Sequence, residues 1–327
     1  MSALAAVTSS PLLSAVVFLV GLGVVLFSVE AFVERVAATA AGLGVSTFFL
    51  TVALAGTDLE NTILGGAAVL GALPDVGLGT VFGEAAFILC LALGLGGLLV
   101  PFEVETPPRY LALTGVAPLA LLALSLDGRL SRLDGAVLVA AFVPAMWLLY
   151  RWERRRDRRY LQPEADLDDG LAAGGDTGSR RLAVELAVLV AAVAGMTLGS
   201  ELAVQGTKGL LAASGVAGLA FGATVLSVVA SLEELLLTVE PVRAGRPAVA
   251  AGNVVGSTLF FVTANAGVLA LIHPLALSPS VWTVQYPFLL GALAIVLLVL
   301  YRGVVSRPIG AGLVALYALY WVVTLRV

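Results

Sequence analysis

Residues 55–62 read Ala55-Gly56-Thr57-Asp58-Leu59-Glu60-Asn61-Thr62, and they lie inside an apolar run long enough to cross a lipid bilayer. A degenerate second copy, Val229-Ala230-Ser231-Leu232-Glu233-Glu234-Leu235, lies inside another such run. Neither run contains a Lys or an Arg. An ionised carboxylate in hydrocarbon costs on the order of several kcal/mol unless something compensates its charge. The two copies therefore predict a bound cation or a proton as the compensating partner.

The composition is typical of a membrane protein. Of the 327 residues, 60% are apolar and 12% are charged, and the mean hydropathy is +1.03. A soluble domain is about one quarter charged and at most about half apolar. Because a helix needs about 20 apolar residues to span a bilayer, we predict an all-α polytopic membrane protein.

Cysteine and histidine are too scarce for several kinds of chemistry. The one cysteine, Cys90, lies in an apolar run, so no disulfide framework is possible. The one histidine, His273, argues against His-ligated metal sites and against a Ser–His hydrolase. No nucleotide-binding motif is present, which argues against an ATP-driven pump. We therefore expect no enzyme activity, no cofactor and no nucleotide or nucleic-acid partner, and we leave the oligomeric state open.

Turn and charge signals divide the chain into about ten apolar spans. Their approximate bounds are 11–33, 42–71, 76–99, 110–126, 134–150, 181–206, 213–240, 247–272, 282–301 and 308–325. The second and seventh spans are long and hold the two motif copies. We therefore expect each of these two helices to be kinked or broken at its motif.

The spans form two halves separated by a polar loop. We predict a first five-helix repeat at residues 1–150, a cytoplasmic linker loop at 151–180 and a second five-helix repeat at 181–327. The loop opens with an Arg-rich run at 151–159 and then becomes acidic and Gly-rich, as flexible linkers do. We interpret the basic run as a topology signal, with binding of anionic lipid as the alternative.

The distribution of basic residues predicts the orientation in the membrane. If the linker loop is cytoplasmic, that side carries all Lys and Arg residues except Arg129, Arg132, Lys208 and Arg326. Such a bias is the usual mark of the cytoplasmic side. Both termini are then expected to face outward.

The two halves are related by a weak internal repeat. Residues 51–62 align with residues 224–235, which matches Glu60 with Glu233. Because each half has an odd number of spans, the second half inserts upside down relative to the first. This is the inverted-repeat plan of secondary transporters, whose sites form near the bilayer midplane from interrupted helices. The same offset aligns three further pairs: Gly79 with Gly252, Val81 with Val254, and Gly83 with Gly256.

These motifs resemble those of the cation/Ca²⁺ exchanger superfamily, in particular prokaryotic sodium/calcium exchangers. Each repeat of that family carries Gly-Thr-Ser-Leu-Pro-Glu, followed by Gly-Asn-x-x-Gly-Ser-x-x-x-Asn/Asp. In the first repeat of this chain the segments read Gly56-Thr57-Asp58-Leu59-Glu60-Asn61 and Gly79-Thr80-Val81-Phe82-Gly83-Glu84. In the second repeat they read Val229-Ala230-Ser231-Leu232-Glu233-Glu234 and Gly252-Asn253-Val254-Val255-Gly256-Ser257. The resemblance covers nearly the whole chain.

Most departures from the family pattern change the charge of the motif. Acidic residues replace neutral ones at four positions: Glu60 and Glu233 for the proline, Asp58 for the first serine, and Glu84 for the distal serine. In the opposite direction, Asn61 replaces the glutamate of the first repeat, whereas Glu234 keeps its counterpart in the second. The final Asn/Asp positions hold Ile88 and Phe261.

The motifs supply oxygen ligands and need neither imidazole nor thiolate. Ca²⁺ takes about six to eight oxygens, and Na⁺ takes a similar cage of hard oxygens. The candidate metal ligands are Thr57, Asp58, Glu60, Asn61, Glu84, Ser231, Glu233, Glu234 and Ser257. Asp58 and Asn61 are three residues apart, so a helix places them on one face, and the second copy repeats that spacing. Glu60 and Glu233 turn away from this face, and we leave open whether they are ligands or structural.

The resemblance implies a secondary antiporter that exchanges Na⁺ for Ca²⁺ by alternating access across a prokaryotic cell membrane. Its partners are then inorganic cations and the lipid bilayer. The alternative is a proton-coupled exchanger of Ca²⁺ or another cation, since desolvated carboxylates titrate readily. A non-transporting membrane scaffold or sensor is the alternative from a different class, and it would not need acids at matching positions in both halves.

Overall fold

The computed structural model describes residues 10–42, 58–153 and 179–327. The chain forms two compact units, one of residues 1–67 with 162–215 and one of residues 68–161 with 216–327. Each unit takes segments from both halves of the sequence. The units therefore cut across the predicted repeats, whose boundaries stay a prediction.

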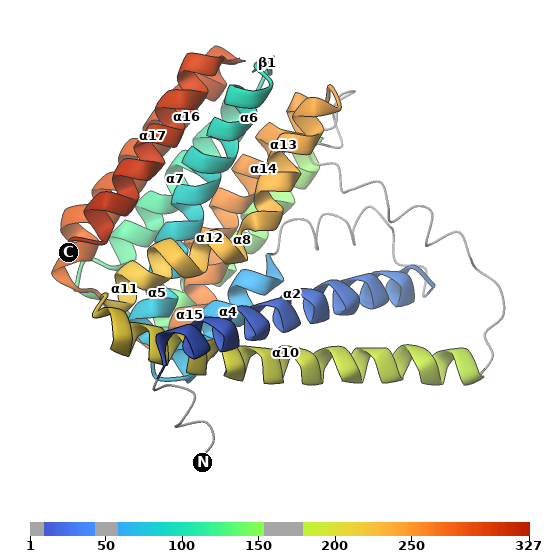
Figure 1. Cartoon of the computed structure of the whole chain (residues 1–327). Coiled ribbons are helices and arrows are strands. Elements are labelled where there is room, and N and C mark those ends of the chain that lie inside the picture. Colours follow the sequence, from blue (N-terminus) through green and yellow to red (C-terminus); the bar gives the residue numbers. More distant parts are fainter. Residues whose placement is uncertain (1–9, 43–57, 154–178) are drawn as a thin grey trace. The chain divides into compact units, whose positions relative to one another are not determined.

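Two long helices form the first unit. These are α2 (Pro11–Gly42) and α10 (Ser179–Ser214), which run alongside each other in Figure 1. A Cβ atom added at Gly21 would lie 2.4 Å from the backbone nitrogen of Ala203, so the two backbones touch without an intervening side chain. Helix α4 (Leu59–Leu70) begins in this unit, directly after the first motif, and ends in the other.

Two three-part helices run through the second unit. In the first half, α5 (Pro74–Ala86) continues through the π-helical segment η1 (Phe87–Ala92) into α6 (Leu93–Leu99). The matching helix of the second half consists of α14 (Pro247–Phe260), η3 (Phe261–Asn265) and α15 (Ala266–Ile272). Both are largely buried. The other helical segments of this unit are α7 (Pro108–Leu124), α8 (Arg132–Glu153), α11 (Gly218–Phe221), η2 (Gly222–Leu226), α12 (Ser227–Ala230), α13 (Leu232–Arg243), η4 (Val281–Gln285), α16 (Tyr286–Arg302) and α17 (Arg307–Thr324).

Two short antiparallel strand pairs each join the two halves of the sequence. β1 (Phe102–Glu103) pairs with β4 (Val304–Val305), and β2 (Arg129–Leu130) pairs with β3 (Leu275–Ala276). β1 and β3 each follow the three-part helix of their half, whereas β2 and β4 each precede the last helix of their half. Exchanging the two halves therefore converts one strand pair into the other, as a two-fold axis between the halves would.

Four glycines show the same correspondence between the two halves, because they lie at two close helix contacts that match each other. A Cβ at Gly310 on α17 would lie 2.5 Å from the carbonyl oxygen of Gly94 on α6. Likewise, a Cβ at Gly267 on α15 would lie 2.7 Å from the carbonyl oxygen of Gly135 on α8. α6 corresponds to α15, and α8 corresponds to α17. The prediction of an all-α membrane protein with two inverted repeats is confirmed.

The described helices form five stretches in each half of the chain, which corresponds to the ten predicted spans. Six helices in the described ranges are long and apolar enough to cross a membrane, or seven if the helical segments on either side of residues 215–217 count as one. α4 and α7 are also apolar, but they have only 12 and 17 residues. Described helical stretches in the first half are α2, α4, α5–α6, α7 and α8, and those in the second are α10, α11–α13, α14–α15, α16 and α17.

The helix that carries the second motif is broken, as predicted. α12 ends at Ala230, Ser231 has φ −98° and ψ 17°, and α13 starts at Leu232. In the first half, α4 starts directly after Asp58, and the lead-in through Thr57 lies outside the described residues. The break places the N-terminal end of α13 within an apolar run, where interrupted helices of transporters form their sites.

We predict that Gly310→Ala lowers the free energy of unfolding by about 1–3 kcal/mol, because the added methyl group meets backbone atoms that cannot move aside. Gly312→Ala on the same helix is the matched control, since a Cβ there meets no heavy atom within 4 Å. Thermal unfolding in detergent, followed by reaction of the buried Cys90 thiol with a fluorogenic maleimide, compares the two variants. Equal melting temperatures would contradict the close contact of α6 and α17.

Candidate cation-binding site

In the first unit, Asp58 caps helix α4. Its Oδ1 accepts a hydrogen bond from the backbone N–H of Asn61 at 3.0 Å, and its Oδ2 accepts one from the side-chain amide of Asn61. Asn61 is the third residue of the helix, which is a position whose N–H an N-cap side chain binds. The structure thus brings these two residues together, as their spacing predicts. The amide oxygen of Asn61 is buried and has no hydrogen-bond partner among the described residues.

In the second unit, side chains of α14 hold the carboxylate of Glu234. Asn253 donates from Nδ2 to Glu234 Oε2 at 2.6 Å. The hydroxyl oxygen of Ser257 lies 3.0 Å and 3.1 Å from the two carboxylate oxygens. Asn253 Nδ2 also lies 3.3 Å from the hydroxyl oxygen of Thr238, one turn beyond Glu234 on α13. Glu234 is only 6% exposed, so α13 and α14 are joined by a buried polar network.

Ser231 and Glu234 have the sequence of a capping box but do not form one. In a capping box, the hydroxyl and the carboxylate both bind backbone N–H groups at the start of the helix. Among the described side chains, Ser231 makes no capping hydrogen bond to α13, and Glu234 is hydrogen-bonded to α14. The Ser231 hydroxyl is buried and has no hydrogen-bond partner in the part of the chain that the structure describes. Such an atom is a candidate ligand for a cation.

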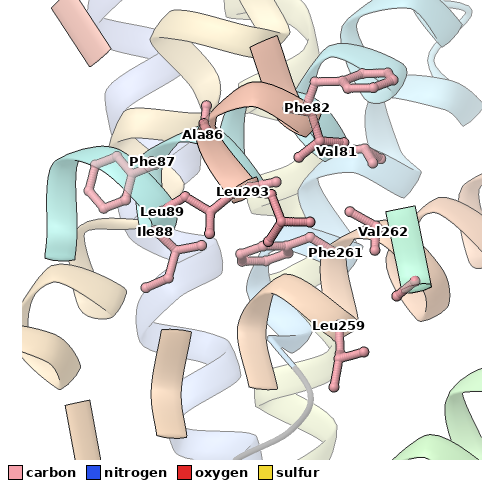
Figure 2. Close-up of a cluster of buried hydrophobic side chains, with 14 of the residues drawn as sticks. Val81, Phe82, Ala86, Phe87, Ile88, Leu89, Leu259, Phe261, Val262 and Leu293 are labelled. Atoms are coloured by element: carbon pink, nitrogen blue, oxygen red, sulfur yellow. The ribbon is translucent and has the colours of Figure 1, made fainter. Parts of the chain in front are cut away.

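Glu84 links the two halves within the second unit. It lies in the last turn of α5, and its Oε2 accepts a hydrogen bond from Nδ2 of Asn265 at 2.9 Å. Asn265 is the last residue of η3, and both side chains are 0% exposed. Figure 2 shows the buried apolar side chains of this region, and two of them, Phe82 and Ala86, flank Glu84 in the chain. The carboxylate therefore lies among hydrocarbon, where an ionised group is costly.

Basic side chains in the second unit lie at helix ends, except Arg129, which lies in strand β2. Those that the structure describes are Arg109, Arg129, Arg132, Arg151, Arg243, Arg246, Arg302, Arg307 and Arg326. Within the described ranges, no group of three or more His, Cys, Asp or Glu side chains could hold a metal ion.

Two of the predicted ligands cannot be placed with the others. Thr57 lies outside the described residues, and so does the side chain of Glu233. Glu60 lies in the first turn of α4 and is partly exposed. Each of the remaining predicted ligands, by contrast, takes part in one of the clusters above or lies at the break before α13.

Three polar residues of these networks were not among the predicted ligands. Asn253 lies inside the second distal motif, so the sequence alone could have indicated it as a residue of the site. Thr238 is recognisable only from its position one turn beyond Glu234, and its hydroxyl also donates to the Glu234 carbonyl at 2.9 Å. The only signal for Asn265 is an amide in an otherwise apolar run, which a motif search does not detect.

The glycines of the distal motifs have different surroundings. A Cβ at Gly79 would lie 2.3 Å from the carbonyl oxygen of Leu219, and one at Gly83 would lie 2.4 Å from that of Ala223. These two glycines let α5 pack directly on α11 and η2. At Gly256 a Cβ would meet no heavy atom within 4 Å, so close packing does not explain that glycine.

Buried carboxylates held by polar side chains, in a helical membrane fold with two repeats, are typical of secondary transporters. The family model described as "Sodium/calcium exchanger protein" matches residues 13–151 and 184–326, with one match in each half. The chain belongs to this family. It is thus a multi-pass membrane protein of the exchanger class.

Relatives and solved structures agree with this family. "Inner membrane protein YrbG" of Escherichia coli K12 is 28% identical over 321 residues, which cover 95% of this chain and 98% of the relative. "Putative antiporter CaxA" of Alkalimonas amylolytica is 25% identical over 304 residues, which cover 90% and 92%. The sodium-calcium exchanger NCX_Mj, soaked with 100 mM Na⁺ and 10 mM Sr²⁺, matches with a TM-score of 0.57 at 22% identity, covering 95% of this chain and 98% of that chain. This likeness shows that the fold is shared.

We predict that Asp58→Ala lowers the free energy of unfolding by about 1 kcal/mol, because α4 loses its N-cap. Asp58→Asn is the matched control, since an asparagine caps a helix about as well as an aspartate. Thermal unfolding of the two purified variants measures the difference. If both variants melt at the same temperature, the cap is not what Asp58 contributes to stability.

Proposed function

We propose that this protein is a Na⁺/Ca²⁺ antiporter that works by alternating access and binds its cations at the buried carboxylates. The observation that carries the proposal is Glu234. Its carboxylate is buried on a helix that starts within an apolar run, and it is hydrogen-bonded by Asn253 and Ser257 of the neighbouring helix. Neutral hydrogen-bond donors such as these orient a carboxylate without cancelling its charge, and intramembrane carboxylates commonly mark ion pathways.

The chemistry of the ligands supports Ca²⁺ and Na⁺ as the transported ions. Both are hard cations that prefer carboxylate, amide, hydroxyl and carbonyl oxygens. The Glu234 cluster offers carboxylate, amide and hydroxyl oxygens, from Glu234, Asn253 and Ser257, and the hydroxyl of Ser231 lies at the break before α13. We propose as ligands the residues predicted from both motifs: Thr57, Asp58, Glu60, Asn61, Glu84, Ser231, Glu233, Glu234 and Ser257.

The relatives support exchange over a structural role. One relative is named as an antiporter, and NCX_Mj is named as a sodium-calcium exchanger. A scaffold or sensor would need neither the buried Glu84 nor the buried Glu234. Proton coupling in place of Na⁺ coupling is the alternative, and transport measurements at a clamped pH separate the two.

We propose that the loop at 151–180 faces the cytoplasm of a prokaryotic cell and that both termini face outward. The support is the excess of Arg on one side of the predicted spans. In the second unit, the side predicted to be cytoplasmic carries Arg109, Arg151, Arg243, Arg246, Arg302 and Arg307 at the ends of described helices.

Reconstitution tests the ion coupling. Proteoliposomes loaded with Na⁺ are diluted into Na⁺-free buffer that contains ⁴⁵Ca²⁺, with an ionophore clamping the pH. We expect Ca²⁺ uptake that requires the outward Na⁺ gradient. Uptake that ignores Na⁺ but follows an imposed pH gradient would replace Na⁺ by H⁺ as the coupling ion.

We predict that Glu234→Gln lowers Na⁺-driven Ca²⁺ uptake at least about tenfold, a loss of about 1.4 kcal/mol or more. The amide keeps the size of the side chain but removes the charge that faces the cation. Glu240→Gln on the same helix is the matched control, because the Glu240 side chain is 70% exposed and pairs with Arg243. Equal uptake by the two variants would show that Glu234 is not a ligand of the transported cations.

Asp58→Asn separates the charge of Asp58 from its capping role. Because the amide can still cap α4, the variant is expected to keep its melting temperature and to lose Na⁺-driven Ca²⁺ uptake. The same proteoliposome assay measures the loss. Uptake at the wild-type rate would show that Asp58 acts only as the N-cap of α4.

A further inference from the structure

Two arginines at adjacent ends of α7 and α8 are held against aromatic rings. Arg109 lies in the first turn of α7, and its Cζ lies 5.1 Å from the ring centre of Trp152, near the end of α8. Arg151 directly precedes Trp152, and its Cζ lies 5.1 Å from the ring centre of Trp147. We propose that these side chains form a binding site for the phosphate of an anionic phospholipid, with Arg109 as its main contact. This inference goes beyond the proposed exchange and does not depend on it.

The aromatic rings fix the position of the Arg109 guanidinium. Tyr110 is 1% exposed, and its ring stacks on that of Trp152 with centroids 5.8 Å apart and planes 16° apart. The Arg109 Cζ also lies 5.8 Å from the Tyr110 ring centre, and Nη2 donates to the Trp152 carbonyl oxygen at 3.5 Å. Cation–π contacts of this kind are attractive. They leave N–H groups at the edge of the guanidinium available for a phosphate, which arginine binds through two parallel hydrogen bonds.

The charges around Arg109 favour an anion. Neither Arg109 nor Arg151 forms an ion pair within the described residues, whereas Arg129 and Arg243 do. Arg109 also lies at the positive end of the α7 dipole, which disfavours a further positive charge. The first turn of α7 contains no acidic residue, and none of the described side chains caps this helix with a hydrogen bond. A phosphate beside Arg109 compensates both the guanidinium and the helix end.

The place of this site in the membrane selects a lipid as the source of the phosphate. α7 and α8 are apolar helices of a membrane protein, and the site lies at one end of each. Trp and Tyr side chains of such helix ends lie at the level of the lipid headgroups, and Trp147 is 52% exposed. Anionic headgroups attract Lys and Arg near the membrane surface. The ligand is therefore an anionic phospholipid rather than free phosphate.

The tryptophans of the site report lipid binding directly. The chain has four tryptophans, and the double substitution Trp282→Phe with Trp321→Phe leaves only Trp147 and Trp152. This full-length variant is reconstituted into phosphatidylcholine vesicles that contain either brominated phosphatidylglycerol or brominated phosphatidylcholine, because bromine quenches nearby indole fluorescence. The ratio of the two quenching strengths measures the preference for the anionic lipid. We expect a preference of at least about fivefold, the factor that one arginine near an anionic surface supplies.

Two substitutions of Arg109 separate the shape of the site from its charge. Arg109→Gln is expected to remove the preference. Arg109→Lys keeps the charge but loses the planar guanidinium, so we expect it to lower the preference at least about twofold. Arg307→Gln is the matched control, because Arg307 is exposed, starts α17 and contacts no aromatic ring within the described residues. It is expected to keep the preference of the parent variant.

Equal quenching by the two brominated lipids in the parent variant would overturn the proposal. An unchanged preference in Arg109→Lys would also overturn it, as would an equal loss in Arg307→Gln and Arg109→Gln, because charge alone would then explain the binding. So would inorganic phosphate that removes the preference at an ionic strength at which chloride does not. If the double tryptophan variant does not fold, the same ratio is measured with all four tryptophans present, and Arg109→Gln must still lower it.

Discussion

Carboxylates placed in hydrocarbon are the constraint on which the rest of this structure depends. Glu84 and Glu234 are both buried in the helices of the second unit, and each is hydrogen-bonded by neutral side chains of α14–η3. A side-chain amide or hydroxyl orients a carboxylate but does not neutralise it. The broken helix at Ser231 and the π-helical segments near Glu84 and Asn265 are irregularities of the kind that supply further oxygens at such a place.

Close backbone packing holds these groups in position. The glycine contact between α6 and α17 has a counterpart between α8 and α15, and the two strand pairs show the same exchange. Each of these contacts joins one half of the sequence to the other. The symmetry therefore shows in the packing even where the sequences of the halves have diverged, as at Glu84 and its counterpart Ser257.

The parts of the site that the sequence predicts are those set by local spacing. Asp58 and Asn61 are three residues apart, and their contact follows from the geometry of one helix turn. The break at Ser231 is likewise predictable, because a polar motif interrupts an apolar run that is too long for one span. The pairing of Glu84 with Asn265 is not predictable in this way, because it depends on how two helices far apart in the sequence pack together.

The central claim is that the buried carboxylates bind cations that compete with one another. Isothermal titration of the full-length protein with Ca²⁺, at increasing fixed concentrations of Na⁺ and constant pH, tests it most directly. The account predicts that the apparent Kd for Ca²⁺ rises as Na⁺ rises, because the two ions share the charge of the same carboxylates. A Kd for Ca²⁺ that does not change with Na⁺ would contradict it.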